Sequence, residues 1–516
     1  MEFSKKEIHT NTLEHTRYSQ LTIDDDFNIP DAKGDVERII AKDGHIIMED
    51  VIAEDGKVRV IGTVCFKAMY KTGKEQPDIE VYTGEIPFED HVNIDGVTRG
   101  SQVECECHLD DITVSTINSR KLEVRGLIGN SISVYSDRVI NPTTNLENGQ
   151  GIECQYNNIS RQELCIAKHD VLKLKEDVDI PQAKPNIREL LWWSVEAQGL
   201  ECKAGDDVLQ VRGELSIFTI YRGEDEHMPI QYMMSIRAFS REIPCQGAKE
   251  NMVLVLDCGT GKKEVSIKAD ADGEDRVIAV DAAIDMNIKM YQQSELKIIS
   301  DMYSPQIELE PVREHFSYEN LVLRNLAKAK VNYRKQISEG EQKFLQVCHI
   351  FGGVDVDDTK IEEDGVNVSG VIKCNLLYIS ASDDPMNCTE FDVPFEYKVE
   401  TMKCKKGCSI RIVPCIDQLT ATLLSSEEVE VKAQVNLSIS VFEKAECDII
   451  SDVNVMPIDY VKKSKAPGIV GYVVKEGDSI WSVARKYYAT TESIRKINGL
   501  DKDQLVPGEK LIVVKS

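Results

Sequence analysis

Three stretches of the chain share one pattern: VRVIGTVCFKAMY at 58–70, LQVRGELSIFTIY at 209–221 and VNVSGVIKCNLLY at 366–378. In each, a valine stands two residues before a glycine, and a tyrosine stands eight residues after it. The glycines are Gly62, Gly213 and Gly370, and the tyrosines are Tyr70, Tyr221 and Tyr378. Apolar residues alternate after the glycine, which is typical of a strand with one buried face. The pattern therefore predicts three copies of one β domain.

The same register extends to both sides of these stretches. Upstream, an IPxAK motif occurs at 29–33 and 180–184, and each proline lies 32 residues before its glycine. The same offset in the third copy falls on Ser338, so the proline is missing there. Downstream come the short segments EIPFED (85–90), EIPCQG (242–247) and DVPFEY (392–397), and then alternating segments at 122–135, 277–291 and 429–442. Each unit of roughly 150 residues is expected to be a mostly antiparallel sandwich-like or barrel-like β domain.

Two residue types within the repeat are expected to be structural. A glycine inside a strand indicates a β-bulge or a close approach of two backbones. The repeated tyrosine is expected at a strand end, with its ring in the core and its hydroxyl at the edge. One segment stays open: NIRELLWWSVEAQG (186–199) has helical spacing at Ile187, Leu190 and Leu191, but its tryptophans favour a strand.

Length and composition limit the number of domains and the kind of protein that the chain can form. A chain of 516 residues predicts about three or four domains, and its 42% hydrophobic residues contain no apolar run long enough to cross a bilayer. The first 28 residues have no apolar signal region, so we expect a polar leader and a protein that stays in the cytosol. The 15 cysteines are scattered and odd in number, which fits free thiols in a reducing compartment.

The net charge of −27 is unevenly distributed. Residues 461–516 hold eleven Lys or Arg and six Asp or Glu, so this part carries +5 and the rest of the chain −32. Nucleic-acid binding needs a basic surface, so the acidic body argues against that class. The C-terminal part is a separately charged unit that suits an acidic partner or is simply solvated.

No catalytic constellation stands out. The string DCGTGKKEV (257–265) has Leu256 and Lys263 where a phosphate-binding loop needs glycine and a hydroxyl residue, so we interpret it as a hairpin turn. Cys105 and Cys107 lack a second ligand pair, and Cys404, Cys408 and Cys415 lie in the lysine-containing string KCKKGCSIRIVPC, which we interpret as a turn into a strand. We expect no metal, no cofactor and no enzymatic activity.

After a charged, Pro- and Gly-containing linker, the period changes from two to helical. Tyr472–Val474 should form a strand, and Ile480, Val483, Ala484 and Tyr487 recur at the spacing of one helix face. Asp478 or Ser479 can cap this helix, and Thr490 or Thr491 can cap a second one. That second helix is expected to turn Ile494 and Ile497 inward and to exit through Asn498-Gly499, before a returning strand at 511–514. The prediction is a βααβ module.

The string YVVKEGDSIWSVARKY (472–487), with Ile494, Asn498, Val506-Pro507-Gly508 and Leu511, resembles the LysM family. Members commonly bind N-acetylglucosamine polymers between two loops, which correspond here to Gly477–Trp481 and Gln504–Gly508. Some members bind proteins instead. The IPxAK motif, the V-x-G strand and the following tyrosine are similar to SPOCS repeats.

Three such repeats followed by one LysM domain resemble the SipL family of clostridial spore-coat morphogenesis proteins over nearly the whole chain. The resemblance implies a scaffold for coat assembly around the forespore, acting in the mother-cell cytoplasm. It also implies a partner, the coat-basement ATPase SpoIVA, engaged through the LysM domain, and further coat proteins as partners of the β repeats. The alternative is a protein that binds peptidoglycan of the cortex or wall.

Ten residues of the LysM surface are candidates for partner contact: Gly477, Asp478, Ser479, Ile480, Trp481, Arg485, Lys486, Leu505, Val506 and Pro507. Ile480 and Trp481 are equally compatible with the module's core, and Arg485 and Lys486 with a solvated helix face. The predicted units are a leader at 1–28, β repeats at 29–170, 171–310 and 311–455, a linker at 456–468 and the LysM domain at 469–516.

Overall fold

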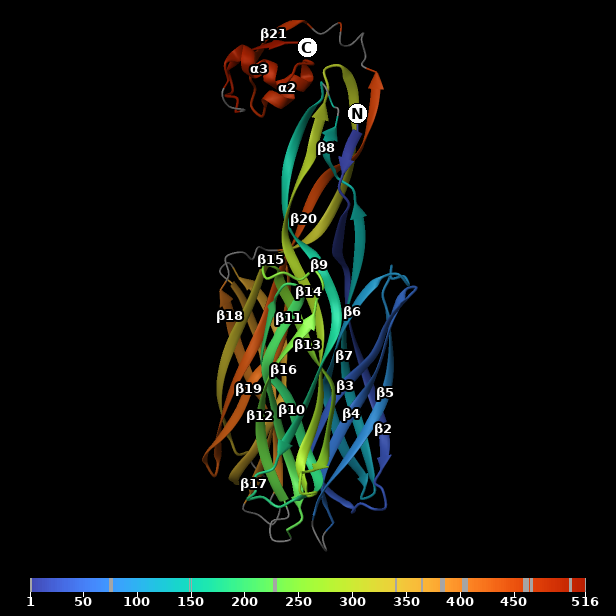
Figure 1. The fold of residues 1–516 in the computed structure, drawn as a ribbon, viewed down its shortest axis with the longest axis vertical. Coiled ribbons are helices and arrows are strands. Elements are labelled where there is room, and N and C mark those ends of the chain that lie inside the picture. Colours follow the sequence, from blue (N-terminus) through green and yellow to red (C-terminus); the bar gives the residue numbers. More distant parts are fainter. Residues whose placement is uncertain are drawn as a thin grey trace.

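The computed structural model describes the chain except residues 1, 74–77, 148, 150, 226–229, 339–340, 363–364, 381–385, 401–406, 458–463, 465–466, 501–503 and 516. Three β domains lie side by side in an elongated body, and several of their strands continue into a narrower stalk (Figure 1). A small module with two helices lies at the far end of the stalk, near the N-terminus (Figure 1). The fold is mainly β, as predicted.

Each β domain consists of two three-stranded antiparallel sheets that share one apolar core. In the first domain, β2(Ile8–Asn28), β7(Lys121–Ile140) and β6(Gln102–Asn118) face β3(Val36–Glu54), β4(Lys57–Thr72) and β5(Ile79–Asn93). In the second, β9(Glu153–Asp179), β14(Asp275–Tyr303) and β13(Val253–Ala269) face β10(Ile187–Ala204), β11(Val208–Gly223) and β12(Ile230–Pro244). In the third, β15(Ile307–Gln336), β20(Glu428–Pro457) and β19(Ser409–Ser425) face β16(Phe344–Glu362), β17(Gly365–Ser380) and β18(Met386–Glu400). The short strands β1(Glu2–Lys5) and β8(Thr143–Glu147) pair in the stalk.

The repeated glycines are places of close approach. A phenylalanine lies opposite each glycine in the neighbouring strand: Phe88 opposite Gly62, Phe239 opposite Gly213, and Phe395 opposite Gly370. A Cβ added at Gly370 would lie 2.1 Å from the Asp355 carbonyl oxygen, and one at Gly213 would lie 3.0 Å from Phe239 Cζ. The repeated tyrosines are buried, as expected, and the Tyr70 hydroxyl reaches Glu80 at 3.1 Å.

The structure corrects several details of the sequence interpretation. Residues 8–28, predicted as a leader, form β2, because the strand pairs with β7 along its length and Leu21, Ile23 and Phe27 point with period two into the core of the first domain. The predicted boundaries at 170/171 and 310/311 fall inside β9 and β15, which run unbroken from body to stalk. The segment left open at 186–199 is strand β10 from residue 187 onward. Most of the predicted linker lies outside the described residues.

Two further corrections concern local register. The DCGTGKKEV string lies within β13, where a β-bulge at 260–263 interrupts pairing with β14, so it is not a hairpin turn. The glycines there allow a close approach, since a Cβ at Gly261 would lie 2.9 Å from Ala283 Cβ. Pro244 ends β12 and is not equivalent to Pro87 and Pro394; the register opposite the repeat glycines places Ala238 at that position.

The three domains meet around a shared apolar cluster. The residues seven positions after each repeat glycine, Met69, Ile220 and Leu377, are all buried in it. Their cross-strand partners are Ala41, Trp192 and His349. Equivalent positions of the three repeats therefore face one another, and the body is an intramolecular assembly of three copies rather than a string of separate domains.

Candidate functional site

The C-terminal module contains β21(Ile469–Val473), α2(Ile480–Lys486), α3(Thr491–Asn498) and β22(Lys510–Val514), with β21 antiparallel to β22. Helix α2 begins at a capping box: the Ser479 hydroxyl oxygen accepts a hydrogen bond from Ser482 N, and the Ser482 hydroxyl oxygen accepts one from Ser479 N. Helix α3 begins at the Thr490 cap and ends at Gly499, which has a φ of 62°. The predicted βααβ order, caps and glycine exit are all present.

The module has one compact core. Its buried members include Tyr472, Ile480, Val483, Ala484, Ile494 and Leu511. Ile480 is only 2% exposed, which decides the open question in favour of a core residue and removes it from the partner surface. Ile497, expected to face inward, is 43% exposed, because it lies on the outer side of the short helix α3.

The two loops of the predicted groove lie next to each other. Gly508 N donates to the Val474 carbonyl oxygen at 2.8 Å, which joins the end of the second loop to the segment between β21 and the first loop. The Asp478 carboxylate accepts hydrogen bonds from Tyr472 OH at 2.6 Å and Lys475 N at 2.8 Å. The bond to Asp478 raises the pKa of Tyr472 to about 12 and lowers the pKa of Asp478. Gly477, Ser479, Val506 and Pro507 are exposed around these loops, and Leu505 is half-buried.

The side chains of Trp481 and Arg485, on α2, contact the stalk. Trp481 Nε1 and Arg485 Nη1 each donate to Asp301 Oδ2 at 2.9 Å. The Trp481 ring also lies edge-to-face on Tyr303, with ring centroids 4.7 Å apart. Lys486 takes no part in this contact and lies near the rings of Tyr472 and Tyr487.

The stalk contributes its own residues to this contact from the end of β14 and the start of β9. Tyr303, only 5% exposed, joins the module's apolar core and donates from its hydroxyl to the Ala489 carbonyl oxygen at 3.1 Å. Glu153 accepts a hydrogen bond from Thr491 Oγ1 at 2.7 Å. Burial raises the pKa of Tyr303, so its hydroxyl stays a donor at any physiological pH. The sequence gives no signal for Asp301, Tyr303 or Glu153, since they belong to another domain and to no motif.

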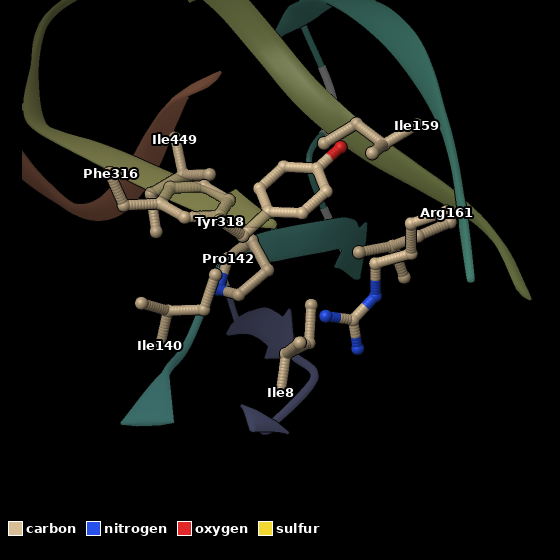
Figure 2. A pocket seen from close by; sticks show the side chains of 9 residues that line it. Ile8, Ile140, Pro142, Ile159, Arg161, Phe316, Tyr318 and Ile449 are labelled. Atoms are coloured by element: carbon tan, nitrogen blue, oxygen red, sulfur yellow. The ribbon is translucent and has the colours of Figure 1, made fainter. Parts of the chain in front are cut away.

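Two cavities lie where the domains meet. The larger, about 280 Å³, is lined by the residues that end the third strand segment of each repeat, Tyr135, Tyr291 and Phe442, together with Lys289 and Arg411. Its cations are matched by carboxylates, since Lys289 pairs with Glu104 at 2.5 Å and Arg411 with Glu319 at 3.4 Å. The smaller cavity, lined mainly by isoleucines with Tyr318 and Arg161, has room for about one water (Figure 2). Both cavities lie between the β domains, and neither is lined by side chains arranged for catalysis.

The candidate thiol ligands that the structure describes are not grouped with further metal-binding side chains. Burial raises the pKa of both Cys105 and Cys107 to about 12, so these thiols stay protonated at neutral pH. Cys404 lies outside the described residues. Among the described residues, no group of three or more His, Cys, Asp or Glu side chains is placed to hold a metal ion.

Comparison with known families identifies both parts of the chain. The SipL, SPOCS domain model matches three times, at residues 35–117, 186–268 and 343–424, and the LysM domain model matches residues 472–514. Among curated proteins, the chain is 43% identical over 42 residues to a "Putative sporulation-specific glycosylase YdhD" of Bacillus subtilis (strain 168). It is 39% identical over 51 residues to a "Probable endopeptidase p60" of Listeria grayi.

These curated matches are limited to the LysM region. They cover 8% and 9% of this chain and 10% of each relative, so the chain spans about a tenth of the length of the curated proteins it matches. No solved structure matches. Within the described residues, no helix is long and apolar enough to cross a membrane. The chain therefore has a SipL-like architecture, with three SPOCS domains followed by one LysM domain.

Proposed function

We propose that the protein is a non-enzymatic scaffold for spore-coat assembly, acting in the mother-cell cytoplasm at the forespore surface. The domain families support a sporulation-related role, and neither family is catalytic. The three β domains would present surfaces for coat proteins, and the LysM domain would bind a SpoIVA-type coat ATPase.

One observation favours a protein over a glycan as the LysM ligand. Trp481, the only tryptophan of the module, is engaged by protein groups of the same chain, the Asp301 carboxylate and the Tyr303 ring. Sugar-binding grooves generally rely on aromatic platforms and amide donors. A face whose only indole is already covered by protein side chains suits a protein partner that offers similar groups, such as a carboxylate beside an aromatic ring.

Peptidoglycan binding is the second candidate, and the family match favours it. The LysM domain is a peptidoglycan-binding type of domain, and both curated relatives match through this region. The loops around Gly477 and Pro507 are exposed, so a sugar polymer has access to them.

Calorimetry separates the two candidates. The full chain is titrated with purified SpoIVA-type ATPase and, separately, with N-acetylglucosamine oligomers. Arg485→Glu, which reverses the charge on the exposed helix face, is compared with Lys496→Glu on α3. We expect ATPase binding that Arg485→Glu weakens and Lys496→Glu leaves unchanged. Sugar binding without ATPase binding would disprove the scaffold-docking proposal and establish the alternative.

A further inference from the structure

In each β domain, one edge strand lies next to the strand that carries the repeat glycine and follows it in the chain. These edge strands are β5, β12 and β18. Within the described part of the chain, each of these strands has a backbone ladder with only one neighbour, β4, β11 and β17 respectively. An open edge is a template for adding a further strand, and proteins usually block it with proline or charged side chains. The three edges can be compared position by position, because the repeat glycine fixes their register.

The first and third edges carry both blocking devices. One residue before the phenylalanine opposite the glycine, β5 has Pro87 and β18 has Pro394. Two residues further back, β5 has Glu85 and β18 has Asp392, and all four residues are exposed. A proline within a paired edge strand has its nitrogen on the open side, so it removes a donor from that side.

The second edge lacks both devices. At the equivalent positions β12 has Ala238 and Ile236, and two residues before Ile236 it has Met234. Met234 is 54% exposed and Ile236 is 52% exposed. Because Ala238 occupies the position of the prolines, its N–H points to the open side and is available to a further strand. The edge of the second domain is therefore apolar, and no proline interrupts its outward backbone groups from Met234 to Ala238. On either side of this segment, the carbonyl oxygens of Tyr232 and Ser240 accept hydrogen bonds from Lys184 and Arg241.

The charge of this edge also differs from its surroundings. Strand β12 has two arginines, Arg237 and Arg241, and one glutamate. By contrast, β5 has four acidic residues and no Lys or Arg, and β18 has four acidic residues and one lysine. Of these three edge strands, β12 is the one with a net positive charge, in a body that carries a large negative charge. Pairing of two β12 strands would bring arginines of like charge together, which disfavours a second copy as the occupant.

We propose that the open edge of β12 binds an extended acidic segment of a partner protein by strand addition. Backbone groups of the segment would continue the sheet, its aliphatic side chains would cover Met234 and Ile236, and its carboxylates would lie near Arg237 and Arg241. The assignment is independent of the LysM domain, which lies at the other end of the molecule (Figure 1).

The test uses the full chain and a fluorescein-labelled peptide of alternating Val and Glu, about eight residues long. A peptide of alternating Val and Lys is the control ligand, and anisotropy reports binding. Ala238→Pro removes the donor, and Pro87 and Pro394 show that this position tolerates proline in a folded domain. Ile236→Glu adds a charge to the edge, and Thr83→Glu adds the same charge to β5, where the equivalent edge is already blocked.

We expect the acidic peptide to bind at least about tenfold more tightly than the basic one, and added salt to weaken its binding. Ala238→Pro and Ile236→Glu should each weaken binding by about tenfold or more, while Thr83→Glu leaves it unchanged. Absence of binding, or equal binding by wild type and Ala238→Pro, would overturn the proposal. So would sedimentation that finds a wild-type dimer which Ala238→Pro dissociates, since the occupant would then be a second copy.

Discussion

The three β domains and the LysM domain are joined to the rest of the molecule in different ways. The β domains meet through a buried cluster of equivalent residues from all three repeats, with buried Lys67 over the rings of Trp192 and Trp193 at 4.6 and 4.1 Å. The LysM domain meets the stalk mainly through Asp301, Tyr303 and Glu153. The first kind of junction buries side chains from all three repeats, whereas the second rests on a few side chains and is small enough for a partner to compete with it. Four experiments test this difference, from the largest expected effect to the smallest.

The LysM core is the most sensitive part of the molecule. Ile494 is fully buried, and in so small a domain the cavity left by Ile494→Ala should reduce the free energy of unfolding by about 4 kcal/mol. Ile497→Ala is the matched control on the same helix, and because Ile497 is exposed its cost should be below about 0.5 kcal/mol. Thermal unfolding followed by NMR of LysM resonances checks both. Equal effects would mean that α3 packs with the opposite face.

Protonation of His349 should weaken the junction of the β domains. The imidazole is stacked on Phe218 at 4.0 Å, and burial, with the nearby Lys67 charge, lowers its pKa to about 4, while Asp43 opposes the shift. The neutral form is therefore favoured in the folded state. The contribution of the neutral imidazole to the free energy of unfolding is complete above pH 6.5. It is lost as the pH falls toward 4, by about 3 kcal/mol in total.

The matched variant is His349→Phe, which keeps a ring against Phe218 and cannot titrate. Urea unfolding is measured for both proteins between pH 7 and pH 4. The stability of the wild type should fall relative to the variant only below about pH 6.5. Parallel curves for the two proteins would show that His349 is not buried at a tight junction.

The repeat glycine tests whether the body folds independently of the LysM domain. An added side chain at Gly213 meets Phe239 and the Gln198 carbonyl oxygen at 3.0 and 3.1 Å, so Gly213→Val should destabilise the second domain by about 2 kcal/mol. Gly259→Val in β13 is the control, because an added Cβ there meets only Asp285 Cβ at 3.9 Å. Circular dichroism melts compare the two, and LysM ligand binding should stay intact. If the Gly213→Val protein were as stable as its parent, the interpretation of Gly213 as a place of close approach would be wrong.

The sequence predicts most of the fold because the repeat has a strong period of two and fixed glycine offsets. The sequence predicts the LysM module almost element by element, since its caps, glycines and helix spacing are local signals. Sequence reasoning failed where the signal is not local. The polar strand β2 has the composition of a leader, and its pairing with β7 depends on residues 93 to 132 positions away.

The candidate site shows the same limit. The residues of the LysM loops were identified from their motif, but the burial of Ile480 and the contact of Trp481 with Asp301 depend on packing within and between domains. Likewise, the short Pro-containing segments were aligned by composition, and only the register opposite Gly213 shows that Ala238, not Pro244, is the equivalent residue in β12. Neighbouring strands, rather than local pattern, decide such positions.

The smallest expected effect concerns the contact between the stalk and the LysM domain. Asp301→Ala removes the acceptor shared by Trp481 Nε1 and Arg485 Nη1, so the indole proton of Trp481 should exchange faster with solvent in an NMR experiment. Glu295→Ala, an exposed carboxylate earlier on β14, is the control and should leave that proton unchanged.

The same pair of variants tests whether a partner competes for this face. If the proposed ATPase binds Trp481 and Arg485, it must first displace Asp301, and removing this competitor should raise its affinity by up to about tenfold, or about 1.4 kcal/mol. Titration calorimetry with both variants measures the difference. A partner that binds Asp301→Ala and wild type equally well, although the indole proton exchanges faster, must use another face of the LysM domain, such as the exposed loops at Gly477 and Val506. A partner that binds Asp301→Ala more weakly must contact the stalk and the LysM domain together, and their junction would then be part of the binding site.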